Sequence, residues 1–286
     1  MRIKLLATDL DGTLLDDFKR LTPKNIQALQ EAHQTGIQVV ICTGRPYHTV
    51  KPYLSLIKIP CWLITNNGAV IRNPQGEITN KNYIQNDSLK RVLEILIQRP
   101  RLYFHGSDAE FTYIDSRWQR MKNIYRFERK SMRPHFRAVI NAAQTVWLTP
   151  IHRRVNFSRF VERGGQMANL IIISGNSEGL KQKKRELETV AGISLTRSGN
   201  DNLEILDNHT SKGNSLKTLS EHLGITSESI AAIGDHDNDL SMIRMAGLGM
   251  ATGNAEKEVK AQADYVTESN NEDALWDAWQ RVSMSR

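Results

Sequence analysis

Four clusters of polar residues each follow a short apolar run, and their carboxylate and amide side chains suit the binding of a metal cation. The clusters are Asp9-Leu10-Asp11-Gly12-Thr13, Thr43-Gly44-Arg45, Asn66-Asn67-Gly68, and Gly234-Asp235 with Asn238-Asp239. Apolar runs of this length indicate buried strands, and open α/β sheets bind ligands beyond the carboxyl ends of their strands. We therefore expect the four clusters to meet at one edge of a sheet.

The carboxylates of such an edge would form a strongly negative site. Its members would be Asp9, Asp11, Asp235 and Asp239. Several carboxylates cannot all stay ionised at close range unless a cation compensates them, and oxygen ligands favour Mg²⁺. Asp9 and Asp11 would point to opposite sides if the strand continued, but Gly12 permits a turn that reorients Asp11.

The elements that position these clusters alternate between strands and helices. The expected N-terminal strands cover residues 3–8, 37–42 and 61–65. Thr22 and Pro23 are suited to begin a helix as N-cap and first helical residue, and Gly36 is suited to end it. A second helix is expected after Pro46. This βαβαβ order predicts a parallel sheet with helices on its faces.

The C-terminal part has the same pattern. Its expected elements are helices over residues 211–223, 240–246 and 272–282, and short strands over residues 230–233, 247–251 and 265–266. We therefore predict an α/β fold: a doubly wound, Rossmann-like parallel-sheet core formed by residues 1–81 and 191–286.

Residues 82–190 differ from both ends and are expected to form an inserted α+β domain. The expected elements are helices over residues 87–98 and 177–190, and strands over residues 102–104, 111–114 and 169–173. This segment carries 20 Lys and Arg against 10 Asp and Glu, whereas the rest of the chain carries 18 against 21. Such a charge asymmetry supports two domains.

The composition is that of an ordinary soluble globular protein, with 40% hydrophobic and 24% charged residues. Cys42 and Cys61 lie in apolar runs and are expected to be buried and unpaired, which suits a reducing cytoplasm. No segment reaches the roughly eighteen apolar residues of a membrane span, and Asp9 interrupts the N-terminal apolar run too early for a signal peptide. We expect a cytoplasmic protein with no membrane partner; no sequence feature indicates its oligomeric state.

In type and order, the clusters resemble the signature motifs of the haloacid dehalogenase-like (HAD) phosphatases. The run from Asp9 to Leu14 is similar to the first motif, Thr43 to the second, Lys212 in Ser211-Lys212-Gly213 to the third, and Gly234 to Asp239 to the fourth. An insertion between the second and third motifs is typical of the Cof-type (IIB) sugar-phosphatase branch, in which it forms a substrate-selecting cap. His236 departs from this pattern, because the branch usually has Gly there.

The resemblance implies a Mg²⁺-dependent phosphatase acting on small phosphorylated metabolites, by analogy sugar phosphates. Asp9 would attack phosphorus and form an aspartyl-phosphate, and Asp11 would protonate the leaving oxygen and then deprotonate water. The expected phosphoryl-binding residues are Thr43, Gly44, Lys212 and Asn238. The expected Mg²⁺ ligands are Asp9, the backbone carbonyl of Asp11, Asp235 and Asp239.

Each of these residues also has a purely structural interpretation. Lys212 could be a solvated helix lysine, and Asn238 and Asp239 could be helix N-caps. Arg45 could contact substrate or form a surface salt bridge. The ordered set favours the catalytic interpretation over chance matches.

The segment from Arg117 to Arg137 contains eight Lys and Arg but a single acid, Glu128. In order of preference, it fits a solvated surface, a field that attracts anionic substrates, or a nucleic-acid interface.

Two rival functions of the whole protein stay open. One is a phosphomutase or phosphotransferase that passes the phosphoryl group to a hydroxyl acceptor. The other, less favoured, is a regulator that binds nucleic acid or a metabolite.

Overall fold

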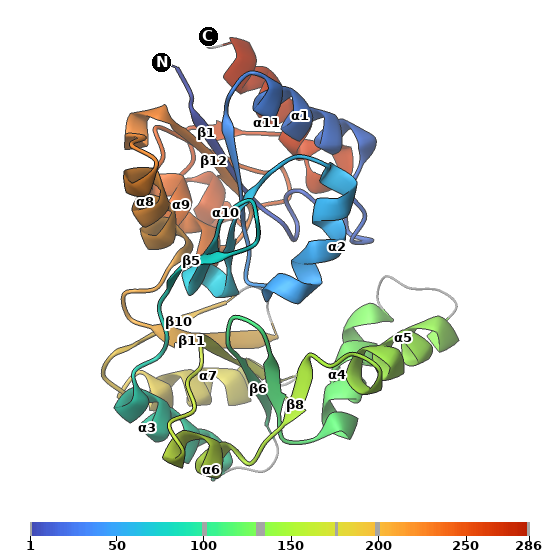
Figure 1. The fold of residues 1–286 in the computed structure, drawn as a ribbon, viewed down its shortest axis with the longest axis vertical. Helices are drawn as coiled ribbons and strands as arrows, with labels where there is room; N and C mark the ends of the chain where they lie inside the picture. Colours follow the sequence, from blue (N-terminus) through green and yellow to red (C-terminus); the bar gives the residue numbers. More distant parts are fainter. Residues whose placement is uncertain (1, 99–101, 130–134, 175–176, 198–200, 285–286) are drawn as a thin grey trace. The chain divides into compact units, whose positions relative to one another are not determined.

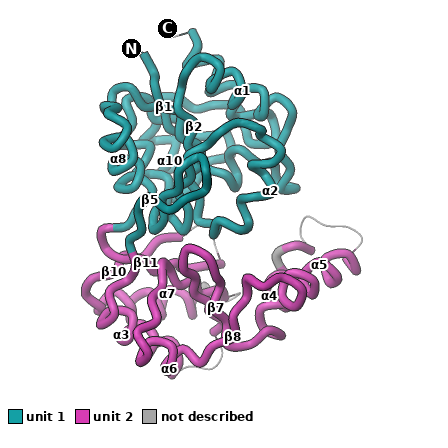
Figure 2. The backbone as a smooth tube through the Cα atoms, viewed as in Figure 1, with its two compact units in different colours: residues 1–82, 210–286 teal, residues 83–209 magenta. Residues whose placement is uncertain are grey.

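The computed structural model of this chain describes residues 2–98, 102–129, 135–174, 177–197 and 201–284. The chain forms two compact units, which Figure 2 shows in two colours. Unit 1 consists of residues 1–82 and 210–286, and unit 2 of residues 83–209. Within the described ranges, no helix has the length and apolarity needed to cross a membrane.

Unit 1 is built on an eight-stranded sheet with the order β14-β13-β12-β1-β2-β3-β4-β5. The strands are β1 (Leu5–Asp9), β2 (Gln38–Cys42), β3 (Trp62–Thr65), β4 (Val70–Arg72), β5 (Ile78–Lys81), β12 (Ile230–Gly234), β13 (Leu248–Ala251) and β14 (Tyr265–Val266). The six strands from β14 to β3 are parallel, and β4 pairs antiparallel with both β3 and β5. Because β1 lies between β12 and β2, the carboxyl ends of these three strands share one edge.

Helices cover both faces of this sheet (Figure 1). They are α1 (Pro23–Gln34), α2 (Tyr47–Ile57), α8 (Lys212–His222), α9 (Leu240–Met245), α10 (Lys257–Lys260) and α11 (Ala274–Met284), with 3₁₀ turns η1 (Asn66–Gly68), η2 (Ser227–Ser229), η3 (Asp237–Asp239) and η4 (Asn270–Glu272). Successive strand residues point to opposite faces. Leu6 therefore packs with Leu29 of α1 and Leu275 of α11, whereas Leu5 packs with Leu216 of α8. The predicted doubly wound α/β core is confirmed.

Local sequence signals set the ends of α1 as expected. The Thr22 hydroxyl accepts a hydrogen bond from the backbone N–H of Asn25, and Pro23 begins the helix. Gly36 follows the helix with a φ of 83°, a conformation that glycine adopts without strain.

Unit 2 contains a six-stranded sheet with the order β10-β11-β9-β6-β7-β8, antiparallel except for β7 and β8. The strands are β6 (Tyr103–Ser107), β7 (Thr112–Ile114), β8 (His152–Arg154), β9 (Asn169–Ile173), β10 (Ile193–Thr196) and β11 (Asn202–Asp207). The helices are α3 (Asn86–Ile97), α4 (Arg117–Glu128), α5 (His135–Trp147), α6 (Phe157–Glu162) and α7 (Ser177–Leu187). Phe104 and Ile172 pack with residues of α3, α6 and α7. The α+β character of this unit agrees with the expectation.

The second boundary between the units lies later in the chain than the sequence indicates. The unit ends at His209, whereas the expected insertion ends at residue 190. The difference arises because β10 and β11 extend the sheet of unit 2: Ile193 lies opposite Asp207, and Ile205 opposite Leu170 of β9.

Both cysteines are buried and unpaired, as expected. Cys42 ends β2 and Cys61 immediately precedes β3. Burial raises the pKa of the Cys61 thiol to about 12, and burial also raises the pKa of Cys42. Neither thiol is therefore suited to nucleophilic chemistry.

Candidate active site

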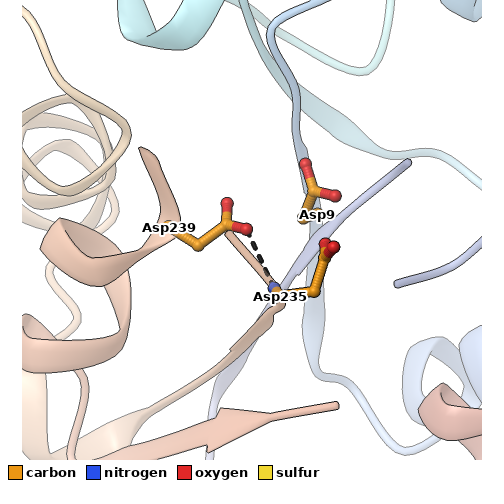
Figure 3. Close-up of side chains that lie close together, drawn as sticks. All are labelled: Asp9, Asp235 and Asp239. Atoms are coloured by element: carbon orange, nitrogen blue, oxygen red, sulfur yellow. Dashed lines mark hydrogen bonds between the residues drawn. The ribbon is translucent and has the colours of Figure 1, made fainter. Parts of the chain in front are cut away.

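Three carboxylates meet where β1 and β12 end side by side. Asp9 is the last residue of β1, Asp235 follows the last residue of β12, and Asp239 ends η3. One oxygen of each lies within 4.8 Å of the others, and all three side chains are buried. Figure 3 shows the three side chains close together. The structure therefore brings together three of the four acidic residues that the sequence singles out.

The loop between β12 and α9 fixes Asp239 in this cluster. Its Oδ2 accepts hydrogen bonds from the backbone N–H groups of Asp235 and His236, both at 3.0 Å (Figure 3 shows the first). A side chain at Gly234 would place Cβ 2.4 Å from Cβ of Asp239, so only glycine fits there. His236 has a φ of −122°, ordinary extended backbone that needs no glycine.

Lys212 supplies a buried positive charge to the cluster. It is the first residue of α8, which begins where the Ser211 hydroxyl accepts a hydrogen bond from the Asn214 N–H at 3.0 Å. Its Nζ lies 2.5 Å from Asp9 Oδ1 and 2.6 Å from Asp239 Oδ1. Burial alone would lower the pKa of Lys212, but the two carboxylates hold that pKa above its ordinary value. The ammonium group therefore stays charged.

One lysine does not compensate three buried carboxylates. Burial raises the pKa of Asp9 well above its ordinary value, although Lys212 opposes this. Burial and the neighbouring Asp239 raise the pKa of Asp235 to about 7. An uncompensated cluster of oxygen donors is what a divalent cation would neutralise. The residues present therefore fit Mg²⁺.

The turn after β1 is shaped around Asp235. Gly12 has a φ of 85°, and a Cβ at this position would lie 2.4 Å from Asp235 Oδ2. The neighbouring Thr13 hydroxyl donates a hydrogen bond to Asp235 Oδ1 at 2.9 Å. The turn after β1 and the loop after β12 are thus joined through the Asp235 carboxylate, which the backbone can approach so closely only because residue 12 is glycine.

The Asp11 carboxylate takes no part in the acidic cluster and instead forms ion pairs with two basic side chains. Arg45 donates from Nε to Oδ2 at 2.6 Å and from Nη2 to Oδ1 at 2.7 Å. Lys19 Nζ lies 2.8 Å from Oδ1. Burial would raise the pKa of Asp11, but Arg45 and then Lys19 outweigh it and hold the pKa below its ordinary range. The sequence did not indicate Lys19 as a site residue, because it lies in a polar stretch without a motif.

The second and third clusters lie together beside the fourth. The Thr43 hydroxyl accepts a hydrogen bond from the Arg45 N–H at 3.1 Å, and the Thr43 carbonyl accepts one from the Asn67 N–H at 3.0 Å. Asn238 Nδ2 donates to Asn67 Oδ1 at 2.9 Å. A Cβ at Gly44 would lie 3.1 Å from the Asn67 amide group. The four clusters therefore gather at one sheet edge, whereas the roles assigned to Thr43, Gly44 and Asn238 stay predictions.

The basic segment of unit 2, residues 117–137, includes all of α4 and the start of α5. Its exposed members in the described residues include Arg117, Lys122, Arg126, Arg129 and Arg137. Arg120 is different, because its Nε donates to His152 Nε2 at 3.2 Å and its Nη1 lies 3.2 Å from His105 Nε2. Lys130 and Arg133 lie outside the described residues.

The chain matches the haloacid dehalogenase-like hydrolase family over residues 6–278. It is 31% identical to Phosphatase YwpJ of Bacillus subtilis, over 94% of this chain and 96% of that protein. It is 28% identical to Pyridoxal phosphate phosphatase YbhA of Escherichia coli, over 96% of this chain and 97% of that protein. A solved haloacid dehalogenase-like hydrolase from B. subtilis has a TM-score of 0.84 and 30% identity, covering 97% of this chain and 99% of that one. The chain therefore belongs to the haloacid dehalogenase-like hydrolases, in their Cof-type branch, and is an enzyme that hydrolyses phosphoric monoesters.

Proposed function

We propose that this enzyme hydrolyses small phosphorylated metabolites of the cytoplasm, sugar phosphates foremost, in a Mg²⁺-dependent reaction through an aspartyl-phosphate on Asp9. The observation that carries the proposal is the buried cluster of Asp9, Asp235 and Asp239 around Lys212. Unit 1 serves as the catalytic core, and unit 2 as the cap that selects the substrate.

Asp9, Asp235, Asp239 and the backbone carbonyl of Asp11 would hold Mg²⁺, which when bound neutralises the repulsion between an anionic nucleophile and a phosphate. Lys212 adds a second positive charge. Because it already holds Asp9 Oδ1, it restricts the rotation of the carboxylate and orients the other oxygen.

In the first step, a carboxylate oxygen of Asp9 forms a bond to phosphorus, and the bond from phosphorus to the leaving alcohol breaks. Asp11 gives a proton to that alcohol oxygen. Because Arg45 and Lys19 hold the pKa of the free Asp11 carboxylate below its ordinary range, Asp11 takes up this proton from solvent when the anionic substrate enters, and the second step returns a proton to it. Thr43, Gly44, Lys212 and Asn238 hold the phosphoryl oxygens by hydrogen bonds and, for Lys212, by charge.

In the second step, water attacks the phosphorus of the aspartyl-phosphate, and Asp11 takes the proton from that water. The bond between phosphorus and the Asp9 oxygen breaks, which regenerates the carboxylate and releases inorganic phosphate. The net reaction consumes one ester and one water and yields one alcohol and one phosphate.

The choice of sugar phosphates rests on the resemblance of the motifs to the Cof-type branch. The relative YbhA is named for pyridoxal phosphate, a phosphorylated metabolite of another kind. A useful substrate panel therefore includes hexose and pentose phosphates, polyol phosphates, pyridoxal phosphate, nucleotides and an aryl phosphate.

Phosphate release from this panel, with and without Mg²⁺, tests the proposal. Asp9→Asn should abolish release, whereas Asp237→Asn should retain it, because Asp237 is an exposed aspartate of the same loop. Asp9→Asn should not unfold the protein, since it removes one of three crowded buried carboxylates. Acid quenching during turnover should trap a phosphoenzyme in the wild type and none in Asp9→Asn.

Two results would count against the proposal. Undiminished release in Asp9→Asn would exclude this nucleophile, and equal release in EDTA would exclude the metal requirement. Addition of a sugar acceptor separates hydrolysis from phosphoryl transfer: a transferase would form a new phosphate ester at the expense of inorganic phosphate.

A further inference from the structure

We infer that Arg45 is the positioning residue for proton transfer, and that its guanidinium group fixes the orientation of the Asp11 carboxylate. This assignment rests on the proposed function, in which Asp11 transfers the proton. It differs from both interpretations that the sequence offers for Arg45, a direct contact to substrate and a surface salt bridge.

The contact between Arg45 and Asp11 constrains an orientation as well as a distance. The two parallel bonds, 2.6 Å from Nε to Oδ2 and 2.7 Å from Nη2 to Oδ1, align the guanidinium plane with the carboxylate plane. A lysine has a compact ammonium group and cannot reproduce this fork. The Arg45 and Asp11 side chains are 22% and 32% exposed, so the pair is mostly shielded, unlike a solvated surface pair.

The guanidinium group is itself held in place by Tyr53 of α2. Arg45 Nη1 donates to the Tyr53 hydroxyl at 3.4 Å, and its Cζ lies 5.4 Å from the centre of the Tyr53 ring. The Tyr53 hydroxyl donates to the Lys19 carbonyl at 3.2 Å, and Lys19 Nζ returns to Asp11 Oδ1. The four residues form a closed ring of polar contacts around one carboxylate.

The backbone of Arg45 connects this ring to the predicted phosphoryl-binding loop. The Arg45 N–H donates to the Thr43 hydroxyl at 3.1 Å, and the Arg45 carbonyl accepts from the Asn66 N–H at 3.1 Å. All three guanidinium nitrogens point to Asp11 or Tyr53. Arg45 therefore fixes Asp11 relative to the loop that carries Thr43, and it is not directed at a separate anion.

The consequence depends on the leaving group. A positioned acid or base contributes about 10²- to 10⁴-fold to a rate. A sugar alkoxide leaves slowly without a proton, whereas a dinitrophenolate leaves readily as an anion. The second step needs a base at water for every substrate. Loss of the fork should therefore slow phosphoenzyme formation from sugar phosphates, spare it for dinitrophenyl phosphate, and slow phosphoenzyme hydrolysis in both cases.

Rapid-quench measurements on Arg45→Lys with these two substrates test the inference. We expect phosphoenzyme formation from a sugar phosphate to fall by roughly 10- to 100-fold and that from dinitrophenyl phosphate by less than about threefold. A burst of dinitrophenolate should precede a slow steady state. Asp11→Asn should give the same pattern, and the double variant should lose no more than Asp11→Asn alone.

Arg20→Lys is the matched control. Arg20 donates from Nε to Asp16 Oδ2 at 2.7 Å in the same stretch of chain, but it has no contact with Asp11 among the described residues. Both rates should stay unchanged in this variant. Tyr53→Phe provides a second, milder test if Arg45→Lys does not fold, because it removes only the hydroxyl that supports the guanidinium group. It should give a smaller loss with the same leaving-group dependence.

Three outcomes would overturn the assignment. Equal losses for both substrates, with a raised KM and effects additive with Asp11→Asn, would make Arg45 a substrate contact. Unchanged rates in folded Arg45→Lys would make the ion pair structural only. A leaving-group-independent loss in Tyr53→Phe would exclude its support of the acid–base step. The wild type reports separately on the proposed function, because a failure to form any phosphoenzyme there would reject the mechanism as a whole.

Discussion

Replacement of Lys212 by methionine tests the claim that its charge stabilises the acidic cluster. The Lys212 side chain is fully buried, and the side chains of Asp9 and Asp239 are 6% and 1% exposed. Removal of one partner from a buried ion pair costs about 3–5 kcal/mol, because the remaining charge is left uncompensated. Two carboxylates lose their cation here, so we expect unit 1 to lose about 3–5 kcal/mol of unfolding free energy at pH 8 in the absence of Mg²⁺.

The loss should shrink as the pH falls. Burial already raises the pKa of Asp9, and removal of Lys212 takes away the charge that opposes this rise. Between the unfolded pKa of about 3.9 and the raised folded value, the folded variant binds more protons than its unfolded chain. Its stability should therefore increase on acidification through this window, relative to the wild type.

Urea unfolding measures the effect. Tryptophan fluorescence follows unit 1, in which Trp62 and Trp279 are buried, and far-UV circular dichroism follows both units. Lys183→Met in unit 2 is the matched control. Lys183 is also buried, but within the described part of the chain it pairs with one carboxylate, that of Glu186, which is 33% exposed. We expect this control to cost about 1–3 kcal/mol. A similar cost in both variants, or a pH-independent cost for Lys212→Met, would refute the reasoning.

Three further predictions concern the turn, the pH and the metal. Gly12→Ala should abolish the Mg²⁺ binding measured by calorimetry, because its Cβ would lie 2.4 Å from Asp235 Oδ2. The control Gly36→Ala has a similar φ of 83° and nothing within 4 Å of its Cβ, so it should cost only about 1–2 kcal/mol of backbone strain and bind Mg²⁺ normally. Burial and then Arg120 hold the pKa of His105 well below its ordinary value. Because the unfolded chain therefore takes up this proton at a higher pH than the folded one, the unfolding free energy of unit 2 should fall by up to about 1.4 kcal/mol per pH unit below about pH 6.5. His105→Phe should flatten that slope in urea titrations. Mg²⁺ at about 100 times its Kd should raise the unfolding free energy of unit 1 by about 2.7 kcal/mol, and an unchanged urea midpoint after EDTA treatment would contradict the metal site.

The elements with strong local signals were predictable from the sequence. β9 was expected over residues 169–173 and has those bounds, and α3 was expected over 87–98 and is found at Asn86–Ile97. Apolar periodicity is local, so it identifies such elements without knowledge of their neighbours. β10 and β11 were not identified, because their place in the sheet of unit 2 depends on antiparallel pairing with β9.

The candidate site divides in the same way. The meeting of Asp9 with Asp235 follows from the rule that parallel strands end at one edge, and the structure has them there. The pairing of Asp11 with Arg45 and Lys19 could not be read from spacing. It depends on the direction that the chain takes after Gly12, at a φ of 85°, and on side-chain directions that no sequence pattern encodes.

The position of β1 between β2 and β12 has a consequence for the order in which the protein folds during synthesis. A ribosome would expose β2 soon after β1, but the other neighbour, β12, only after all of unit 2 has emerged. Unit 2 is continuous in the chain and can complete its own sheet first. Until β12 emerges, one edge of β1 has no strand partner and is open to association with other chains. A nascent chain that has reached residue 209 carries Asp9 but lacks Lys212, Asp235 and Asp239, so phosphatase activity should appear only after residue 239 has been synthesised.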